Sequence, residues 1–129
     1  RAKSYMSERQ QFGEPLSNFQ APQFKLADMA TELIAARQMI RMAASRVDAG
    51  HSEATVYAAM AKQFATDVGF KVCNEALQIH GGYGYMQEYP LERHIRDTRV
   101  HQILEGTNEI MRVITARRLL ALADIEAIQ

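Results

Sequence analysis

The stretch that decides the fold is residues 52–81, which read SEATVYAAMAKQFATDVGFKVCNEALQIHG. Apolar side chains recur there every three or four residues, which is the spacing of one face of an α-helix. Ser52 is placed to cap the first turn, and Gly81 is placed to end the helix. We therefore expect a helix to about Ile79, with these inward side chains: Val56, Met60, Phe64, Val68, Val72 and Ile79.

A second long helix is expected on the N-terminal side, from about Pro22 to Ala49. Gly50 ends it. The residues before it, up to about Gln11, indicate the end of another helix, which Gly13 and Pro15 terminate. The second helix shows one apolar seam in steps of four and three residues, formed by Met29, Leu33, Ala36, Ile40, Ala43 and Val47.

Two further helices are expected on the C-terminal side. Pro90 suits the first turn of a short helix, which pairing of Glu92 with Arg96 supports across one turn. The last helix follows Gly106, and one of its faces carries Ile110, Val113, Ile114, Arg117, Leu120 and Ala121 at helical spacing. No run of strict alternation argues for strands. The sequence therefore predicts an all-α, up-and-down helical bundle.

The composition indicates an ordinary globular domain. Of the 129 residues, 47% are hydrophobic and 23% are charged, and 15 basic residues balance 15 acidic ones. This balance indicates neither a nucleic-acid-binding nor a membrane surface. No apolar run reaches the length of a membrane span, and the first residues lack the apolar core of a signal peptide. We expect one domain over residues 1–129, inside the cell and cut from a longer parent.

Two kinds of site are not expected. The histidines, His51, His80, His94 and His101, lack the His-Glu-x-x-His spacing that places two metal ligands on one helix face. Gly82-Tyr83-Gly84 holds the first two glycines of a dinucleotide fingerprint, but the third is missing and a helix precedes them. By themselves these glycines are better explained as a helix stop.

A carboxylate on a glycine-containing loop is the first candidate for chemistry. Residues 102–112 read QILEGTNEIMR, so Glu105 lies just before the last helix. Gly106 supplies a hinge, Thr107 or Asn108 can cap the helix, and Glu109 lies near the positive end of its dipole. From this segment alone, Glu105 and Glu109 are best explained as acids that complement the dipole. A base aimed from the loop is the alternative.

Three motifs, which follow one another along the chain, favour the interpretation of Glu105 as a base. Residues 8–16 read ERQQFGEPL, residues 78–86 read QIHGGYGYM, and residues 105–107 read EGT. Together they resemble the C-terminal domain of the acyl-CoA dehydrogenases, flavoproteins that desaturate acyl-CoA thioesters. The resemblance covers nearly all of the chain. The amino-acid sequences of the last two motifs are similar to those of short- and branched-chain members. This similarity implies that the protein acts in fatty acid or branched-chain amino acid breakdown.

The resemblance implies that Glu105 is the base that removes the α-proton while the β-hydrogen leaves as hydride to the flavin. A carboxylate in a dry pocket gains the basicity that this step needs. A backbone N–H of the same loop would polarise the thioester carbonyl. Other implied contacts follow the motif: Gly106 and Arg117 meet the substrate or its CoA moiety, and Thr107, Asn108 and Glu109 meet the cofactor.

The resemblance also implies FAD as the cofactor. The implied contacts are Arg9, Phe12 and Gln20 near the start, and Gln78, Ile79, His80, Gly81 and Gly82 at the end of the long helix. In the family such contacts reach the flavin of a neighbouring subunit, which implies a homo-oligomer, a tetramer built as a dimer of dimers. An electron-transfer flavoprotein is the implied acceptor, in a bacterial cytoplasm or a mitochondrial matrix.

The chain departs from the family in lacking the N-terminal helical domain and the middle β-domain. We therefore expect these 129 residues alone not to be an enzyme. A domain that only binds, and a helical oligomerisation or interaction module, remain alternatives. The co-occurrence of Arg9, the Gly81-Gly82 turn and Glu105 favours the catalytic domain, because an assembly module needs none of them.

Overall fold

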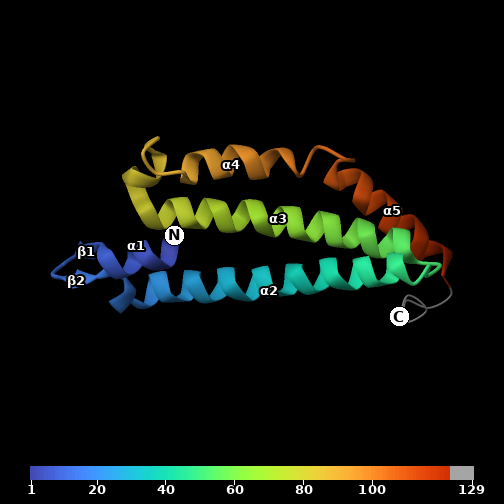
Figure 1. Ribbon diagram of the computed structural model, residues 1–129, viewed down its shortest axis with the longest axis horizontal. Coiled ribbons are helices and arrows are strands. Elements are labelled where there is room, and N and C mark those ends of the chain that lie inside the picture. The colour runs from blue at the N-terminus through green and yellow to red at the C-terminus, as the bar shows by residue number, and fades with distance from the viewer. Residues whose placement is uncertain (123–129) are drawn as a thin grey trace.

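The structure, a computed structural model, describes residues 1–122, which are mostly helical. Figure 1 shows the elements in chain order. They are α1 (Ala2–Glu8), β1 (Gln10–Gln11), β2 (Glu14–Pro15), η1 (Leu16–Asn18), α2 (Gln20–Asp48), α3 (Ala54–His80), η2 (Gly81–Tyr85), α4 (Leu91–Val100) and α5 (Asn108–Ala121).

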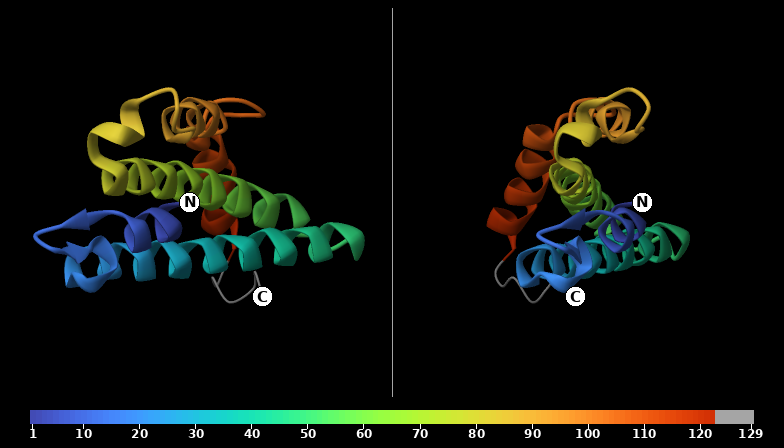
Figure 2. Two further views of the ribbon diagram at one scale, coloured as in Figure 1. Left: turned by 60° about the vertical axis from the view of Figure 1, so that its left-hand side comes forward. Right: turned by 90° about the vertical axis from the view of Figure 1, so that its left-hand side faces the viewer.

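The helices form layers around α3. α2 and α3 run antiparallel along the length of the molecule, and α4 and α5 follow one another along the other side of α3 (Figures 1 and 2). The predicted all-α, up-and-down arrangement is confirmed. α3 is the central layer because α2 covers one of its sides and α4 and α5 cover the other.

The N-cap of α3 lies one residue after the predicted N-cap. Glu53, not Ser52, is the N-cap, and the Glu53 N–H donates to His51 Nδ1 at 3.0 Å. Ser52 is exposed, so the predicted cap is wrong. The predicted end is confirmed, since Gly81 caps α3 with a φ of 57°, a conformation that favours glycine.

Only half of the apolar residues predicted to line the buried face of α2 are buried. Met29, Ala36 and Ala43, each seven residues from the next, are buried, while Leu33, Ile40 and Val47 are 42–56% exposed. A single straight partner, α3, covers only a narrow stripe of a helix. Leu33, Ile40 and Val47 form the outer stripe of α2, an apolar edge left uncovered by the described residues.

The predicted last helix is present as α5, but most of the residues that repeat along one of its faces are exposed. Ile110, Val113 and Leu120 of α5 are 40–87% exposed, and Arg117 and Ala121 are exposed too. The packed face is rotated, and Leu119 and Leu122 pack against the buried cluster of Ala43, Tyr57 and Ala61.

A small hairpin replaces the predicted end of the first helix. α1 stops at Glu8, and Gln10 and Gln11 pair antiparallel with Pro15 and Glu14. The turn consists of Phe12 and Gly13, both with positive φ (54° and 84°), as a two-residue hairpin turn requires. Strands were not expected because two residues are too few to show alternation.

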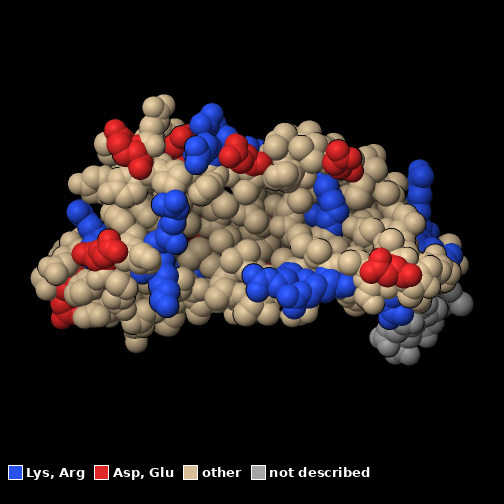
Figure 3. All heavy atoms as spheres, viewed as in Figure 1, with Lys and Arg blue, Asp and Glu red and all other residues tan. Residues whose placement is uncertain are grey.

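The predicted short fourth helix is present, but Pro90 precedes its first turn and does not lie within it. Pro90 is the N-cap of α4, and Arg96 donates to Glu92 at 3.1 and 3.3 Å across one turn. Basic and acidic side chains are interspersed on the face seen in Figure 3, so this face carries no field of a single sign.

Candidate functional site

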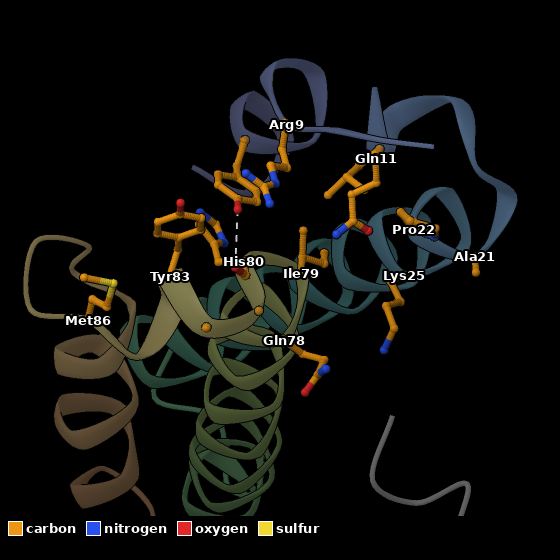
Figure 4. A pocket seen from close by; sticks show the side chains of 14 residues that line it. Arg9, Gln11, Ala21, Pro22, Lys25, Gln78, Ile79, His80, Tyr83 and Met86 are labelled. Atoms are coloured by element: carbon orange, nitrogen blue, oxygen red, sulfur yellow. Dashed lines mark hydrogen bonds between the residues drawn. The ribbon is translucent and has the colours of Figure 1, made fainter. Parts of the chain in front are cut away.

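A groove of about 700 Å³ lies where α1 and the hairpin meet the start of α2 and the end of α3. We call it the hairpin groove. It brings Arg9 together with the residues from Gln78 to Gly82, although some seventy positions separate them in the sequence (Figure 4). Its lining is Tyr5, Arg9, Gln11, Leu16, Ala21, Pro22, Lys25, Gln78, Ile79, His80, Gly81, Gly82, Tyr83 and Met86.

Arg9 is the candidate anion-binding group of this groove. Its guanidinium carbon lies 5.3 Å from the centre of the Tyr83 ring, a cation–π contact that orients the side chain. Among residues 1–122, Arg9 forms no salt bridge. Its charge is therefore available to a ligand, and a guanidinium matches the oxygens of a phosphate.

The glycines beside Arg9 leave room for a ligand. A Cβ added at Gly81 or Gly82 would meet no atom within 4 Å, so packing does not explain either glycine. Gly81 is explained by its φ of 57°. Gly84 differs, because a Cβ there would lie 2.6 Å from the Leu77 carbonyl oxygen. Open backbone at the first two glycines suits a phosphate, whereas Gly84 is required by the fold.

The His80 side chain is used inside the protein. It is 5% exposed, and its Nδ1 lies 2.7 Å from the Ala76 carbonyl oxygen. Its ring stacks on Tyr5 at 4.1 Å, and the Tyr5 hydroxyl donates to the His80 carbonyl oxygen at 3.3 Å (Figure 4). Burial raises the pKa of Tyr5 above its ordinary value of 10.0, although Arg9 opposes the shift. Both the ring and the carbonyl oxygen of His80 thus have partners within the described chain, and the cofactor contact expected of His80 stays a prediction.

Phe12 and Gln20 lie at the same end of the molecule but outside the lining of the groove. Phe12 stands at the tip of the hairpin and is 93% exposed, and its ring contacts Phe19 edge-on at 6.3 Å. Gln20 is exposed at the first position of α2. A positive φ at a non-glycine residue such as Phe12 costs roughly 1–2 kcal/mol of backbone energy.

The second candidate group is the 101–107 loop between α4 and α5. Glu105 and Gly106 both have positive φ, 55° and 92°. Glu105 is exposed, and its backbone N–H donates to no backbone carbonyl oxygen of the described residues. Its carboxylate forms no salt bridge among residues 1–122 either. Both groups are thus available to a ligand.

The residues that follow Glu105 have different environments. Thr107 is the N-cap of α5 and accepts from the Ile110 N–H at 3.3 Å, which settles which of the two predicted residues caps the helix. Asn108 is only 2% exposed, and its amide donates to Thr66 and Asp67 on α3. The Asn108 N–H also donates, to the Gln102 carbonyl oxygen at 3.0 Å. Both its side chain and its N–H are therefore used inside the described chain, and the cofactor contact expected of Asn108 stays a prediction.

Glu109 and Arg117 both face outward from α5. The Glu109 side chain is 81% exposed, and its nearest cation is Arg112 at 4.0 Å. Arg117 lines an open hollow of about 620 Å³ between the start of α3 and α5. Beside it, Arg118 donates to Glu53, and this hydrogen bond lowers the Glu53 pKa below 4.5. Arg117 is the one exposed arginine of the pair.

The hairpin lies beyond the C-terminal end of α3, whereas the loop between α4 and α5 lies beside its N-terminal half (Figure 1). Lys62 of α3 donates to the Gly106 carbonyl oxygen, and Gln78 of α3 lines the groove. Sixteen residues of helix separate those two contacts, or roughly 24 Å. The structure therefore does not bring Arg9 and Gln78 to Glu105 within one chain.

Neither a metal centre nor a membrane span is found in the described part of the chain. No group of three or more His, Cys, Asp or Glu side chains within residues 1–122 is arranged to hold a metal ion. None of the described helices is long and apolar enough to cross a membrane.

Comparisons with known proteins agree on one family. The family model "Acyl-CoA dehydrogenase, C-terminal domain" matches residues 1–120. Mitochondrial isobutyryl-CoA dehydrogenase of Bos taurus is 55% identical over 119 residues, which is 92% of this chain and 29% of the bovine protein.

Solved structures give the same result. Butyryl-CoA dehydrogenase of Megasphaera elsdenii matches with a TM-score of 0.89 and 48% identity, over 92% of this chain and 31% of that one. The FAD complex of PigA matches with a TM-score of 0.87 and 32% identity, over 92% of this chain and 30% of that one. The chain thus spans about three tenths of the length of these proteins.

Proposed function

The chain belongs to the acyl-CoA dehydrogenase family, and we propose that it is the C-terminal catalytic domain of a longer, FAD-dependent enzyme. That enzyme introduces a double bond between the α and β carbons of a short or branched acyl-CoA. Similarity to isobutyryl-CoA and butyryl-CoA dehydrogenases supports this choice of substrate. Because the chain covers about three tenths of these relatives, the activity requires the rest of the parent protein.

Glu105 is the base that takes the α-proton. Bound FAD supplies the acceptor for the hydride that leaves the β-carbon. The single observation that carries this assignment is the exposed Glu105 carboxylate on a positive-φ turn, with no salt bridge among the described residues. A carboxylate that neutralised a neighbouring cation would be a weaker proton acceptor, whereas this one is available to a substrate.

The Glu105 backbone N–H is the donor for the thioester carbonyl. Loss of the α-proton moves negative charge onto that oxygen, and a fixed N–H donor stabilises the charge. Since Glu105 would supply both the base and the donor, the turn itself aligns the two groups. Gly106 lies next to them, where a larger side chain would crowd the substrate, and Arg117 is the residue that we assign to the CoA moiety.

The hairpin groove is the part that we assign to the FAD phosphates. Arg9 supplies charge, and the Gly81-Gly82 backbone allows a close approach. Phe12 and Gln20 extend the same contact, while Thr107 and Glu109 serve at the flavin end. Roughly 24 Å of α3 separates Gln78, in the groove, from Lys62, which contacts the Glu105 loop, and this separation supports contacts from two subunits to each cofactor. We assign the homo-oligomer as a dimer of dimers.

The outer stripe of α2 favours assembly as a second function of the same domain. Leu33, Ile40 and Val47 remain 42–56% exposed, which is costly for an isolated domain. We assign this stripe to contacts with the other domains or subunits. An electron-transfer flavoprotein is the proposed electron acceptor, and a mitochondrial matrix or bacterial cytoplasm is the proposed compartment, as for relatives named mitochondrial or found in bacteria.

The test is purification of the full-length parent with its visible spectrum and oligomeric state recorded. We expect a yellow tetramer whose flavin is bleached by butyryl-CoA or isobutyryl-CoA and much less by octanoyl-CoA. A colourless protein contradicts the FAD assignment, and a clear preference for octanoyl-CoA contradicts the substrate assignment.

A further inference from the structure

Lys62 of α3 reaches the loop that carries Glu105. Its Nζ donates to the Gly106 carbonyl oxygen at 2.7 Å and to Asn108 Oδ1 at 2.7 Å. The two acceptors lie on either side of the α5 N-cap. Neither acceptor is a carboxylate, so the ammonium is used to hold backbone and amide groups.

This arrangement differs from that of the other lysines on the α2–α3 pair. Lys71 of α3 pairs with Glu32, and Lys25 of α2 pairs with Glu75. These are the ordinary ion pairs of a helix surface. Lys62 forms no salt bridge among residues 1–122. Its position is therefore explained by the loop that it contacts.

A second residue of α3 fastens the two ends of the same turn. Asp67 Oδ1 accepts from Gln102 Nε2 at 2.7 Å and from Asn108 Nδ2 at 2.7 Å. The Asn108 N–H in turn donates to the Gln102 carbonyl oxygen at 3.0 Å. Asp67 Oδ2 accepts from Arg112 at 3.0 Å, which fixes the carboxylate. Residues 102 and 108 are thereby closed into a rigid frame.

Within this frame, Gly106 is the residue of the loop whose backbone torsions are least restricted. Gly106 has a φ of 92° and no side chain to restrict it. The bond from Lys62 to the Gly106 carbonyl oxygen fixes the rotation of the peptide that follows Gly106. Because Glu105 immediately precedes that glycine, fixing this peptide also limits where the Glu105 backbone lies, and hence the point from which its side chain extends.

We propose that Lys62 is a positioning residue for proton abstraction, which orients the Glu105–Gly106 turn while Asp67 holds its ends. The proposal rests on the function assigned to Glu105 above. It places no group on the substrate: Lys62 acts through the Gly106 carbonyl. Displacing a reacting group by about 1 Å can slow a reaction roughly 100-fold, so the anchor matters although it lies behind the turn.

The test compares Lys62→Met and Lys62→Arg in the full-length enzyme, with Lys71→Met as the matched control. Lys71→Met removes the same group from the same helix and breaks an ion pair away from the loop. Four quantities are measured: flavin content, melting temperature, the rate of flavin reduction by butyryl-CoA, and solvent exchange of the α-proton of a non-reducible thioester.

For Lys62→Met we expect reduction and exchange to fall together by about 10- to 100-fold, with flavin content and KM little changed. Lys62→Arg should recover most of the rate, since a guanidinium can donate to both oxygens. Lys71→Met should keep the parental rate. If Lys62→Met gives no folded protein, Lys62→Gln, neutral but polar at this half-buried position, should show at least a tenfold loss.

If the flavin of Lys62→Met or Lys62→Gln is reduced by butyryl-CoA at the parental rate, the proposal is overturned. A rate loss that merely follows flavin content also overturns it, as does a loss that Lys62→Arg does not recover at equal flavin content. Glu105→Gln distinguishes failure of the positioning function of Lys62 from failure of the assignment of Glu105 as the base. A slow Glu105→Gln beside a parental Lys62→Met rejects only the positioning function, whereas a fast Glu105→Gln rejects the base assignment itself.

Discussion

Arg118 Nε donates to Glu53 Oε2 at 2.6 Å and thereby joins α5 to the start of α3. The Glu53 side chain is 7% exposed, and the second guanidinium nitrogen of Arg118 donates to its other oxygen, so the pair is bidentate. Bidentate pairs are the strong form of this interaction. The helix that follows the 101–107 loop is thus fixed at its far end as well as at Thr107.

The Glu53–Arg118 pair predicts a dependence of stability on pH. The hydrogen bond from Arg118 lowers the pKa of Glu53 below its ordinary value of 4.5. A carboxyl whose pKa is lowered by folding stabilises the fold above its unfolded pKa, and this contribution is lost as the pH falls through the folded pKa. We expect Glu53→Gln to lower the melting temperature of the full-length protein at pH 7, with the difference shrinking below about pH 4.5.

The control for this prediction is Glu92→Gln. Glu92 pairs with Arg96 on the surface of α4, where the arginine side chain is 70% exposed. Exposed pairs of this kind contribute roughly 0.3–0.5 kcal/mol, so the melting temperature should hardly change. Equal losses from both variants would show that the Glu53 pair has no special weight.

Two glycines of one turn provide a second prediction. A Cβ at Gly84 would lie 2.6 Å from the Leu77 carbonyl oxygen and 3.0 Å from His80 Cβ, whereas a Cβ at Gly82 would meet nothing within 4 Å. Gly84→Ala should therefore destabilise the protein by about 1–3 kcal/mol through overpacking. Gly82→Ala should leave the melting temperature of the apoprotein nearly unchanged but lower the flavin content of the full-length protein.

Denaturation of the apo forms and flavin absorbance of the holo forms separate these effects. If Gly82→Ala retained full flavin content, the open backbone at that position would have no function in cofactor binding. If Gly84→Ala were as stable as the parent, the close approach to Leu77 would be relieved by movement of η2.

The helices were predictable because their signals are local. The spacing that identified α3 and the glycine that ends it lie within one stretch of sequence. The burial of α2 was predicted only in part, since Met29, Ala36 and Ala43 face α3 but Leu33 and Ile40 do not. Apolar periodicity indicates that one face of a helix is covered in the assembled protein, but it does not indicate which element or subunit covers that face.

The candidate site was predictable where a motif carried it. Arg9 and the Gly81-Gly82 turn were identified from their motifs, and the fold brings them into one groove. Lys62 and Asp67 were missed, because a lysine and an aspartate on a helix surface have no distinguishing pattern. Their partners in the loop are more than thirty positions away, and only the packing of α4 and α5 on α3 brings them into contact.

Arg9→Ala should separate cofactor binding from chemistry. Its guanidinium lies over the Tyr83 ring and forms no salt bridge among the described residues, so it contributes charge to the groove rather than to folding. We expect the full-length variant to contain less FAD and to form a weaker oligomer, with Arg9→Lys intermediate because an ammonium lacks the planar fork. Flavin content by absorbance and assembly by sedimentation are the measurements. Parental values for both would reject Arg9 as a contact.

Glu105→Gln is the decisive variant, because it keeps the size of the side chain but removes the group that accepts a proton. Flavin content should be unchanged, since the loop is held by Lys62 and Asn108 rather than by the Glu105 carboxylate. A positioned general base contributes about 100- to 10,000-fold, so stopped-flow bleaching of the flavin should slow by at least that lower factor. Exchange of the α-proton of a non-reducible thioester should stop as well. Glu109→Gln, which removes the same charge from an 81% exposed position four residues away, is the control. Because we assign Glu109 to the flavin end, its flavin content should fall, but the flavin that is bound should be reduced at nearly the parental rate. A slower Glu109→Gln, or a Glu105→Gln that bleaches at the parental rate, would return Glu105 to the function of an acid at a helix end.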